Sequence, residues 1–281
     1  MANETISGLM EALRTLELKS NEEWMASIEA RKVAEARFHD HSHELNEAHD
    51  EVYTNSKFYS VAKASDDFYD RWVADHAPGK VVLDYACGNG GGALRAARAG
   101  ARLAIGLDIS RNSIETAKKD AAAENLVNTC FVQGDCEHTG LPDDSVDVVL
   151  CAGMLHHIDL TYAFPELRRI LRPGGIIIAC EALNYNPIIK LYRRLTPELR
   201  TEFEVDHIIS HREVRFASHF FEVRHITYWH LCTILAVPLR DTGLFKPVLG
   251  LLRAVDSVLL RLPLVRNMAW QFTFELVKPS H

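Results

Sequence analysis

A glycine-rich turn and a later carboxylate are the residues of this chain best suited to hold a ligand. Gly88-Asn89-Gly90-Gly91-Gly92 follows the apolar residues Val81–Leu83, which predict a short buried strand, and precedes Ala93–Ala99, which predict a helix. Glycine lets the backbone approach a ligand closely, and a helix N-terminus offers free N–H groups. Asp108 stands 20 residues after Gly88, the spacing expected of a carboxylate that accepts hydrogen bonds from ribose hydroxyls. The pattern predicts a nucleotide-binding βαβ unit.

Two ligands compete for this turn. Gly88 to Ala93 formally match the G-x-G-x-x-A pattern of NAD-binding proteins, although a run of glycines satisfies that pattern in several registers. Asp84 ends the first predicted strand, and a carboxylate beside the turn would repel a pyrophosphate and tolerate a cation. S-adenosylmethionine has no phosphate, and it carries a sulfonium and an ammonium. The acidic residue therefore favours S-adenosylmethionine over NAD.

A pair of histidines supplies the side chains best suited to proton transfer. His156 and His157 follow the predicted strand Val146–Cys151. Imidazole titrates near neutral pH, so either ring could take the proton of a hydroxyl that attacks a methyl group. The alternative is that one histidine hydrogen-bonds the backbone while the other packs in the core.

Glu181 ends the next predicted strand, Ile176–Cys180, and is the candidate orienting group for the histidine pair. A carboxylate beside an imidazole raises its basicity and fixes its tautomer. The competing interpretation is an ion pair between Glu181 and Arg193 or Arg194.

Several short sequence motifs, used here as landmarks, follow one another along residues 65–183. They are Leu83–Gly90, Gly106–Ser110, Gly134–Cys136, Leu141-Pro142 with Asp147–Val149, Leu155–His157 and Leu171–Gly175. In this order and at this spacing they resemble the class I S-adenosylmethionine-dependent methyltransferases, and the Leu-His-His triplet is similar to that of members acting on small molecules. One departure is Ala86, which stands where the family usually has glycine and puts the shape of the loop in question.

The resemblance implies S-adenosylmethionine as the cofactor and assigns its contacts. Asp135 would meet the adenine amino group and Cys136 the edge of the ring, although Cys136 is alternatively a small buried hydrophobic residue. Tyr59 would touch the methionine carboxylate, or else it is a core or rim aromatic residue. The expected cofactor contacts are Tyr59, Asp84, Ala86, Gly88, Gly90, Asp108, Ile109, Asp135, Cys136 and Ala152.

The resemblance also implies the fold. It is a doubly wound α/β sandwich with a Rossmann-like sheet of seven strands in the order 3-2-1-4-5-7-6, the last strand antiparallel. Residues 65–183 would form the cofactor-binding core, with a turn at Arg172–Gly175 before the fifth strand. Residues 1–64 are expected to be helices that cover the site. Residues 184–281 would supply lid helices, the sixth strand, an apolar helical insertion at 231–267 and the last strand.

The implied reaction is in-line transfer of a methyl group to a small or amphiphilic acceptor. An oxygen acceptor with His156 or His157 as the base is favoured. A thiol or a quinone-type carbon comes next, since a thiol needs less help from a base. Two other classes stay open: an NAD-dependent oxidoreductase, which Asp84 disfavours, and a non-catalytic scaffold with the same fold. The candidate acceptor contacts are Tyr185, His207 and His211.

Composition limits the partners. The net charge of −7 and the lack of a Lys/Arg run argue against a nucleic acid substrate. Six cysteines without a C-x-x-C pair, and an N-terminus without the pattern of a signal peptide, predict a cytoplasmic protein with neither zinc nor disulfides. His39 and His43 would share a helix face, but a solvated polar stretch is favoured and no metal is expected.

The insertion 231–267 combines an apolar surface with basic residues. Leu244–Leu262 predicts a helix on which Lys246, Arg253 and Arg261 share one stripe, while leucines and valines fill the rest. Three explanations remain open: burial against the protein's own lid, a homodimer interface, or contact with an anionic membrane surface or a lipophilic acceptor. We expect the insertion to cover the acceptor site, so that the acceptor has a sizeable apolar part.

Overall fold

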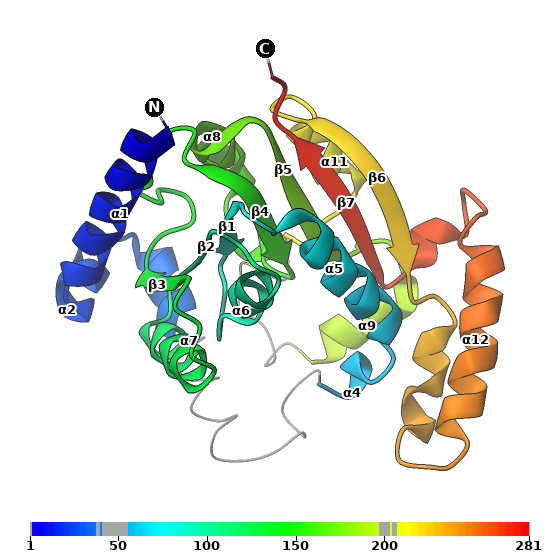
Figure 1. Ribbon diagram of the computed structural model, residues 1–281. Helices are drawn as coiled ribbons and strands as arrows, with labels where there is room; N and C mark the ends of the chain where they lie inside the picture. Colours follow the sequence, from blue (N-terminus) through cyan, green and yellow to red (C-terminus); the bar gives the residue numbers. More distant parts are fainter. Residues whose placement is uncertain (1, 38–39, 41–55, 197–202, 204–206, 281) are drawn as a thin grey trace.

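The computed structural model describes residues 2–37, 40, 56–196, 203 and 207–280, which form a sheet with helices on both faces (Figure 1). The sheet has seven strands in the order β3-β2-β1-β4-β5-β7-β6, which confirms the expected topology. β7 is antiparallel to both of its neighbours, and the remaining neighbouring pairs are parallel. The strands are β1 (Val81–Tyr85), β2 (Leu103–Asp108), β3 (Thr129–Gln133), β4 (Val146–Ala152), β5 (Leu171–Ala182), β6 (Glu222–Trp229) and β7 (Gln271–Val277).

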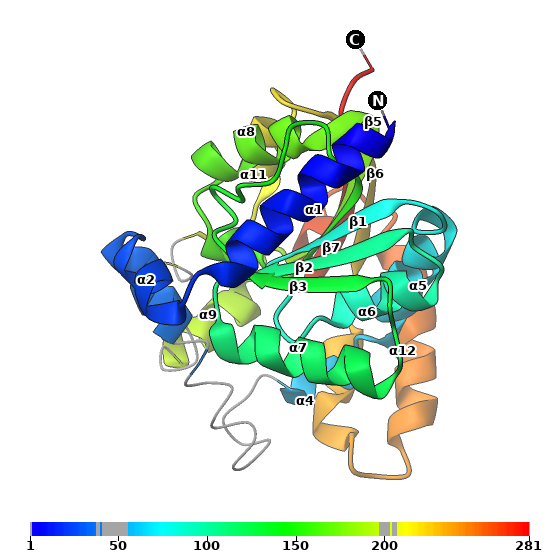
Figure 2. The same cartoon turned by 60° about the vertical axis from the view of Figure 1, so that its left-hand side comes forward.

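Two layers of helices enclose the sheet (Figure 2). One face is covered by α1 (Ala2–Leu18), α8 (Leu160–Ile170) and α11 (His211–Ala217), and the other by α5 (Lys63–His76), α6 (Gly91–Arg98) and α7 (Arg111–Ala123). Successive side chains of a strand point to opposite faces, so Leu83 of β1 packs in the first layer and Val82 in the second. The α/β sandwich expected from the sequence is therefore confirmed.

The segment Arg172–Gly175 differs from the expected turn, because it belongs to β5. Gly174 N–H donates to the carbonyl of Lys278 at 2.9 Å, and Lys278 N–H donates to the carbonyl of Gly175 at 3.0 Å. Gly174 has a φ of +75°, which accommodates the kink. The prediction of a turn was wrong because pairing with a residue beyond β7 holds the kinked segment in the strand.

The remaining helices flank this core. Residues 30–37 are helical, and so are α2 (Asn21–Ala26), α4 (Ser56–Tyr59) and α9 (Pro187–Leu195). The insertion contains η4 (Thr233–Leu239), α12 (Phe245–Leu259) and η5 (Arg266–Met268), and α12 stands beyond the edge of the sheet beside β6 (Figure 1). Ala236 and Val237 of η4 and Leu249 of α12 pack together on Val61, which lies beside α4. Within the described ranges, every helix is too short or too polar to cross a lipid bilayer.

Candidate functional site

A pocket lies where β1, β2 and β4 end. These strands are parallel, so their carboxyl ends meet at one edge of the sheet, where doubly wound proteins bind ligands. The cavity has a volume of about 150 Å³. Of the residues predicted from the sequence, those that line it are Ala86, Gly88, Asp108, Ile109, Asp135, Cys136, Ala152 and His157. The other lining residues are Arg31, Lys32, Glu35, Ser113, Glu137, Gly153, Met154 and Ile158.

The turn between β1 and α6 needs left-handed backbone. Gly88 and Gly90 have φ angles of +50° and +80°, and a Cβ on Gly90 would lie 2.7 Å from the ring of Phe131. Gly90 is therefore required by packing and lies outside the pocket lining, whereas Gly88 lines the pocket. Ala86 has a φ of +55° despite its methyl group, a conformation that costs a residue with a Cβ roughly 1 kcal/mol. Alanine thus adopts here the conformation that glycine prefers.

Asp108 ends β2 and is oriented by backbone groups. Its Oδ2 accepts a hydrogen bond from Gly88 N–H at 2.7 Å, and its Oδ1 accepts one from Ser110 N–H at 2.8 Å. Ser110 in turn starts α7, where its hydroxyl accepts from Ser113 N–H at 3.1 Å. A carboxylate has about four acceptor sites, so one fixed in this way can still serve the hydroxyls of a ligand.

Asp84 is buried beneath the turn and does not line the pocket. Its Oδ2 accepts a hydrogen bond from Ala93 N–H at 2.8 Å, in the first turn of α6. Gly92 is required beside it, because a Cβ there would lie 2.6 Å from Asp84 Oδ1. Burial raises the pKa of the Asp84 carboxyl to about 7. The structure shows Asp84 supporting the start of α6, and its role as a cofactor contact stays a prediction.

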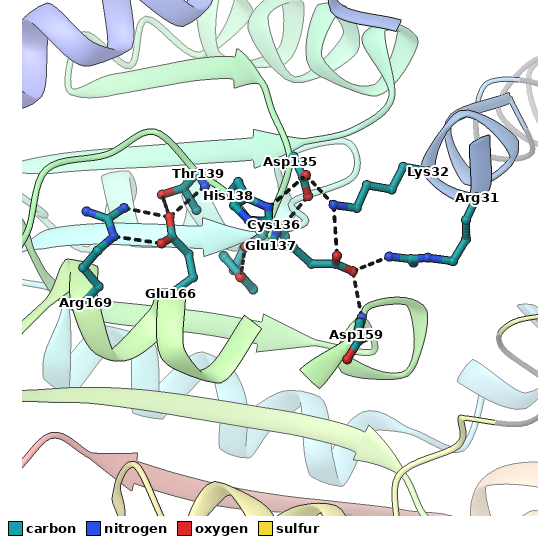
Figure 3. A network of polar contacts seen from close by, with 11 residues as sticks. Arg31, Lys32, Asp135, Cys136, Glu137, His138, Thr139, Asp159, Glu166 and Arg169 are labelled. Carbon is teal, nitrogen blue, oxygen red and sulfur yellow. Dashed lines mark hydrogen bonds and ion pairs between the residues drawn. The ribbon is translucent and has the colours of Figure 1, made fainter. Parts of the chain in front are cut away.

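Arg31 and Lys32, two basic side chains of the helix at residues 30–37, line the pocket and point toward acidic side chains of the loop after β3 (Figure 3). Lys32 Nζ lies 2.6 Å from Asp135 Oδ2 and 2.9 Å from Glu137 Oε2. Arg31 Nη2 lies 2.6 Å from Glu137 Oε1, which also accepts a hydrogen bond from Asp159 N–H at 2.8 Å. Lys32 and Glu137 are only 4% and 3% exposed, so this is a buried ionic network. The network links the helix at residues 30–37 to the loop after β3.

Lys32 was not among the residues predicted from the sequence. Burial alone would lower the pKa of its ammonium, but hydrogen bonds to Asp135 and Glu137 raise that pKa above its ordinary value. Lys32 is therefore charged at neutral pH. Lys32 and Asp135 are 103 residues apart, and Lys32 lies in none of the recognised landmarks. The sequence carries no signal that distinguishes this lysine from those on solvated helix faces.

The two histidines have different surroundings. His156 is buried, and its Nδ1 lies 2.7 Å from Glu181 Oε2. The second oxygen of Glu181 accepts hydrogen bonds from Met154 N–H at 2.9 Å and Leu155 N–H at 2.7 Å. Glu181 thus fixes both the His156 ring and the loop after β4. In the part of the chain that the structure describes, its ionic partner is His156 and no arginine.

His157 lines the pocket, and His156 does not. The Nδ1 of His157 lies 3.6 Å from Glu35 Oε2, which comes from the helix at residues 30–37. The two imidazole rings are in contact and tilted by 37° to each other, with centroids 4.3 Å apart. A molecule in the pocket can therefore contact His157, while the ring of His156 contacts the ring of His157 from outside the pocket lining.

Tyr59, Tyr185 and His211 lie outside the pocket lining. Tyr59 is exposed on α4, and its ring centroid lies 6.1 Å from that of Trp270. Tyr185 and His211 contact each other, since the Tyr185 hydroxyl accepts a hydrogen bond from His211 N–H at 3.2 Å. The structure thus brings together two of the three residues predicted to hold the acceptor, and their role stays a prediction.

His207 lies on an aromatic stack that reaches the pocket rim. Its ring is exposed and stacks on Phe203 with centroids 3.8 Å apart. The guanidinium of Arg31, which lines the pocket, lies 4.6 Å from the centroid of the same phenyl ring. His207 is therefore one side chain removed from a lining residue.

Metal binding finds no support in the described ranges. No group of three His, Cys, Asp or Glu side chains among these residues could hold an ion. The polar stretch with His39 and His43 lies outside the described residues. All six cysteines are free thiols, and burial raises the pKa of the Cys136 thiol well above its usual range.

Residues 83–179 match the model of a family described as a methyltransferase domain. The matched range holds the glycine turn, Asp108, Asp135 and both histidines. This part of the chain therefore has the sequence and the fold of a methyltransferase domain. Its cofactor is S-adenosylmethionine, as expected from the sequence.

Known methyltransferases are similar to this chain over the domain. A sterol 24-C-methyltransferase of Gibberella zeae is 32% identical over 134 residues, which cover 43% of this chain and 35% of that protein. The 27-O-demethylrifamycin SV methyltransferase of Amycolatopsis mediterranei is 35% identical over 99 residues, which cover 34% of this chain and 36% of that protein. The chain thus spans only about a third of the length of either relative.

Solved structures share the fold over a longer range. A geranyl diphosphate methyltransferase, solved in complex with S-adenosylmethionine, superposes with a TM-score of 0.55 at 18% identity. The superposition covers 74% of this chain and 83% of that one. At this identity the similarity establishes the fold and does not establish the acceptor.

Proposed function

We propose that this protein is an enzyme that transfers a methyl group from S-adenosylmethionine to a small or amphiphilic acceptor, most favourably to an oxygen atom. The observation that supports the proposal is that His157 lines the same pocket as Asp108 and Asp135. One cavity therefore contains a candidate base and both carboxylates expected to hold the nucleoside.

The lining of the pocket suits the adenosine part of the cofactor. Asp108 and Asp135 can accept hydrogen bonds from ribose hydroxyls and from an adenine amino group. Ile109 and Cys136 add apolar surface for a flat ring. Asp135 already accepts a hydrogen bond from Lys32, so an adenine amino group at Asp135 would share the carboxylate with this ammonium.

The chemistry that we propose for the chain is proton removal and positioning. When bound, S-adenosylmethionine supplies an electrophilic methyl group on a sulfonium. As the acceptor oxygen forms its bond to that methyl carbon and the sulfur–carbon bond breaks, His157 accepts the hydroxyl proton. Glu35, 3.6 Å away, would stabilise the resulting imidazolium. Glu181 holds His156 against the back of the His157 ring and so limits where His157 can point.

A carbon acceptor is the second candidate, because a similar protein is a sterol 24-C-methyltransferase. Carbon methylation also ends with the loss of a proton, which His157 could accept. An oxygen acceptor remains the first choice, since a hydroxyl must lose its proton during the attack and the base therefore acts in the methyl-transfer step itself.

The test is an acceptor screen on the full-length protein. We would supply S-adenosylmethionine with hydroxyl, thiol and quinone-type acceptors and measure release of S-adenosylhomocysteine. We expect turnover with a hydroxyl compound and none with its methyl ether, which lacks the proton. If the protein binds S-adenosylmethionine but releases no product with any acceptor, a non-catalytic scaffold would replace the proposed enzyme.

A further inference from the structure

A second cavity lies between the end of β6 and one side of α12. Its volume of about 410 Å³ exceeds the volume of the pocket at the ends of β1, β2 and β4. Tyr228 and Trp229 contribute aromatic surface on the β6 side. The opposite side carries three arginines, Arg253, Arg261 and Arg266. The lining comes from residues 64, 226–233 and 253–266, so none of it belongs to the methyltransferase domain at residues 83–179.

Two of the three guanidinium groups, those of Arg253 and Arg266, are not fully satisfied by the protein. The Nε and Nη2 atoms of Arg253 and the Nε atom of Arg266 are buried and form no hydrogen bond. In the described part of the chain, none of the three arginines has an acidic side chain as an ion-pair partner. Arg266 instead lies over the ring of Tyr228, 5.1 Å from its centroid. Since a buried donor without an acceptor is costly, the cavity is incomplete by itself.

Asp256, a carboxylate in this lining, is engaged elsewhere. It accepts hydrogen bonds from three consecutive backbone N–H groups, those of Leu231 at 3.0 Å, Cys232 at 2.6 Å and Thr233 at 3.3 Å. These bonds hold the chain where it leaves β6. One carboxylate so occupied leaves the three arginines with an excess of positive charge.

His230, the histidine of the lining, is uncharged at neutral pH. Burial lowers the pKa of His230 to about 4, so its ring is neutral at pH 7, and its Nε2 lies 2.8 Å from the hydroxyl of Ser65. Nearby on α5, Asp67 is already paired with Lys63 at 2.7 Å. The insertion 231–267 carries five basic and two acidic residues in a chain whose net charge is −7. Positive charge is therefore concentrated where the second cavity lies.

We propose that this cavity binds a phosphate-type anion, either a soluble phosphate compound or the phosphate headgroup of a lipid. A guanidinium presents paired donors that match two oxygens of one phosphate, and three such groups suit a ligand with several oxygens and more than one negative charge. Tyr228 and Trp229 would pack against the organic part of the ligand. The inference does not depend on methyl transfer, because no residue of the first pocket takes part in it.

The direct test is calorimetric titration of the full-length protein with sodium pyrophosphate at low ionic strength. We expect one saturable site, and Arg253→Gln and Arg261→Gln should each weaken binding about tenfold or more. Arg240→Gln is the matched control, since Arg240 belongs to the same insertion but lies outside the cavity, and it should leave the affinity unchanged. Should Arg253→Gln fail to fold, Arg261→Gln decides, because Arg261 is exposed.

A second experiment distinguishes a lipid headgroup from a soluble phosphate compound. Full-length protein would be floated with phosphatidylcholine vesicles that contain or lack phosphatidic acid. Flotation that needs phosphatidic acid and is lost in Arg261→Gln assigns a lipid headgroup, and pyrophosphate binding without flotation assigns a soluble compound. The proposal is overturned if neither probe binds, or if the variants bind as the wild type does. Affinity for S-adenosylmethionine, measured on the same samples, should not change and so reports separately on the proposed enzyme.

Discussion

The pocket at the ends of β1, β2 and β4 has two walls that are built in different ways. On the sheet wall, formed by the turns after β1 and β2, Asp108 is oriented by the backbone N–H groups of Gly88 and Ser110. On the helical wall, formed by residues 30–37, Lys32 is held by side-chain carboxylates from a loop 103 residues away. The sheet wall is therefore local and made by the backbone, whereas the helical wall depends on tertiary packing of charged groups. Substitutions in the two walls should have different consequences.

Asp84, the buried carboxyl beneath the sheet wall, should give the largest effect, a loss of stability as pH rises. Burial raises the pKa of Asp84 from 3.8 to about 7, so the folded protein keeps a proton that the unfolded chain has already lost. The unfolded state binds fewer protons between these two pKa values, and stability contributed by the neutral carboxyl is therefore lost as pH rises through that window. Relative to Asp84→Asn, the wild type should lose on the order of 4 kcal/mol between about pH 4 and pH 7.

Urea unfolding of both proteins across this pH range measures the effect. A stability difference that stays constant with pH would mean that Asp84 is ionised in the fold. The sheet wall would then rest on a buried charge at the start of α6.

The helical wall should lose stability when its central cation is removed. Lys32→Met leaves the half-buried Asp135 and the buried Glu137 without their shared ammonium, and removing one partner of a buried pair costs about 3 kcal/mol or more. Arg31→Met is the matched control, because the Arg31 side chain is 27% exposed and contacts only Glu137 in this network. Urea unfolding at pH 7 should show a clearly smaller loss for Arg31→Met. Equal losses would contradict a buried network centred on Lys32.

His157 contacts the helical wall through Glu35, and its removal should affect catalysis more than binding. With a hydroxyl acceptor, His157→Ala should lower kcat by about 10²-fold or more, while the affinity for S-adenosylmethionine stays nearly unchanged. His156→Ala removes the partner of the buried Glu181, so it should lower the free energy of unfolding as well as the rate. A His157→Ala enzyme with the turnover of the wild type would point to catalysis by proximity alone or to a thiol acceptor.

The difference between the walls explains how far the sequence predicted the site. The sheet wall was predictable because its determinants are close in the chain: an apolar strand, a glycine turn and a carboxylate 20 residues later. The helical wall was not, because Lys32 meets Asp135 only through the fold. For the same reason, pairing of Gly174 and Gly175 with Lys278 overrode the turn predicted at Arg172–Gly175. The order of the sheet was predicted because the landmarks resemble a family whose topology is known.

Ala86 should give the smallest effect, and one that tests the strain in the sheet wall. Its φ of +55° favours glycine, so Ala86→Gly relieves strain but also loosens the unfolded chain, and the net gain in stability should be about 0.5 kcal/mol. Ala117→Gly is the control in the right-handed middle of α7 and should lower stability by about 1 kcal/mol. Thermal unfolding of the two variants should therefore shift in opposite directions. Shifts in the same direction would show that the loop at Ala86 is unstrained.

The most direct measurement is calorimetric titration of S-adenosylmethionine into the wild type, Asp108→Ala and the control Asp120→Ala, which changes an exposed carboxylate on α7. If the pocket at the ends of β1, β2 and β4 holds the cofactor, Asp108→Ala should weaken binding by ~2 kcal/mol or more, because two charge-assisted hydrogen bonds are lost. Asp120→Ala should bind as the wild type does. Unchanged affinity in a folded Asp108→Ala protein would contradict the placement of the cofactor in this pocket.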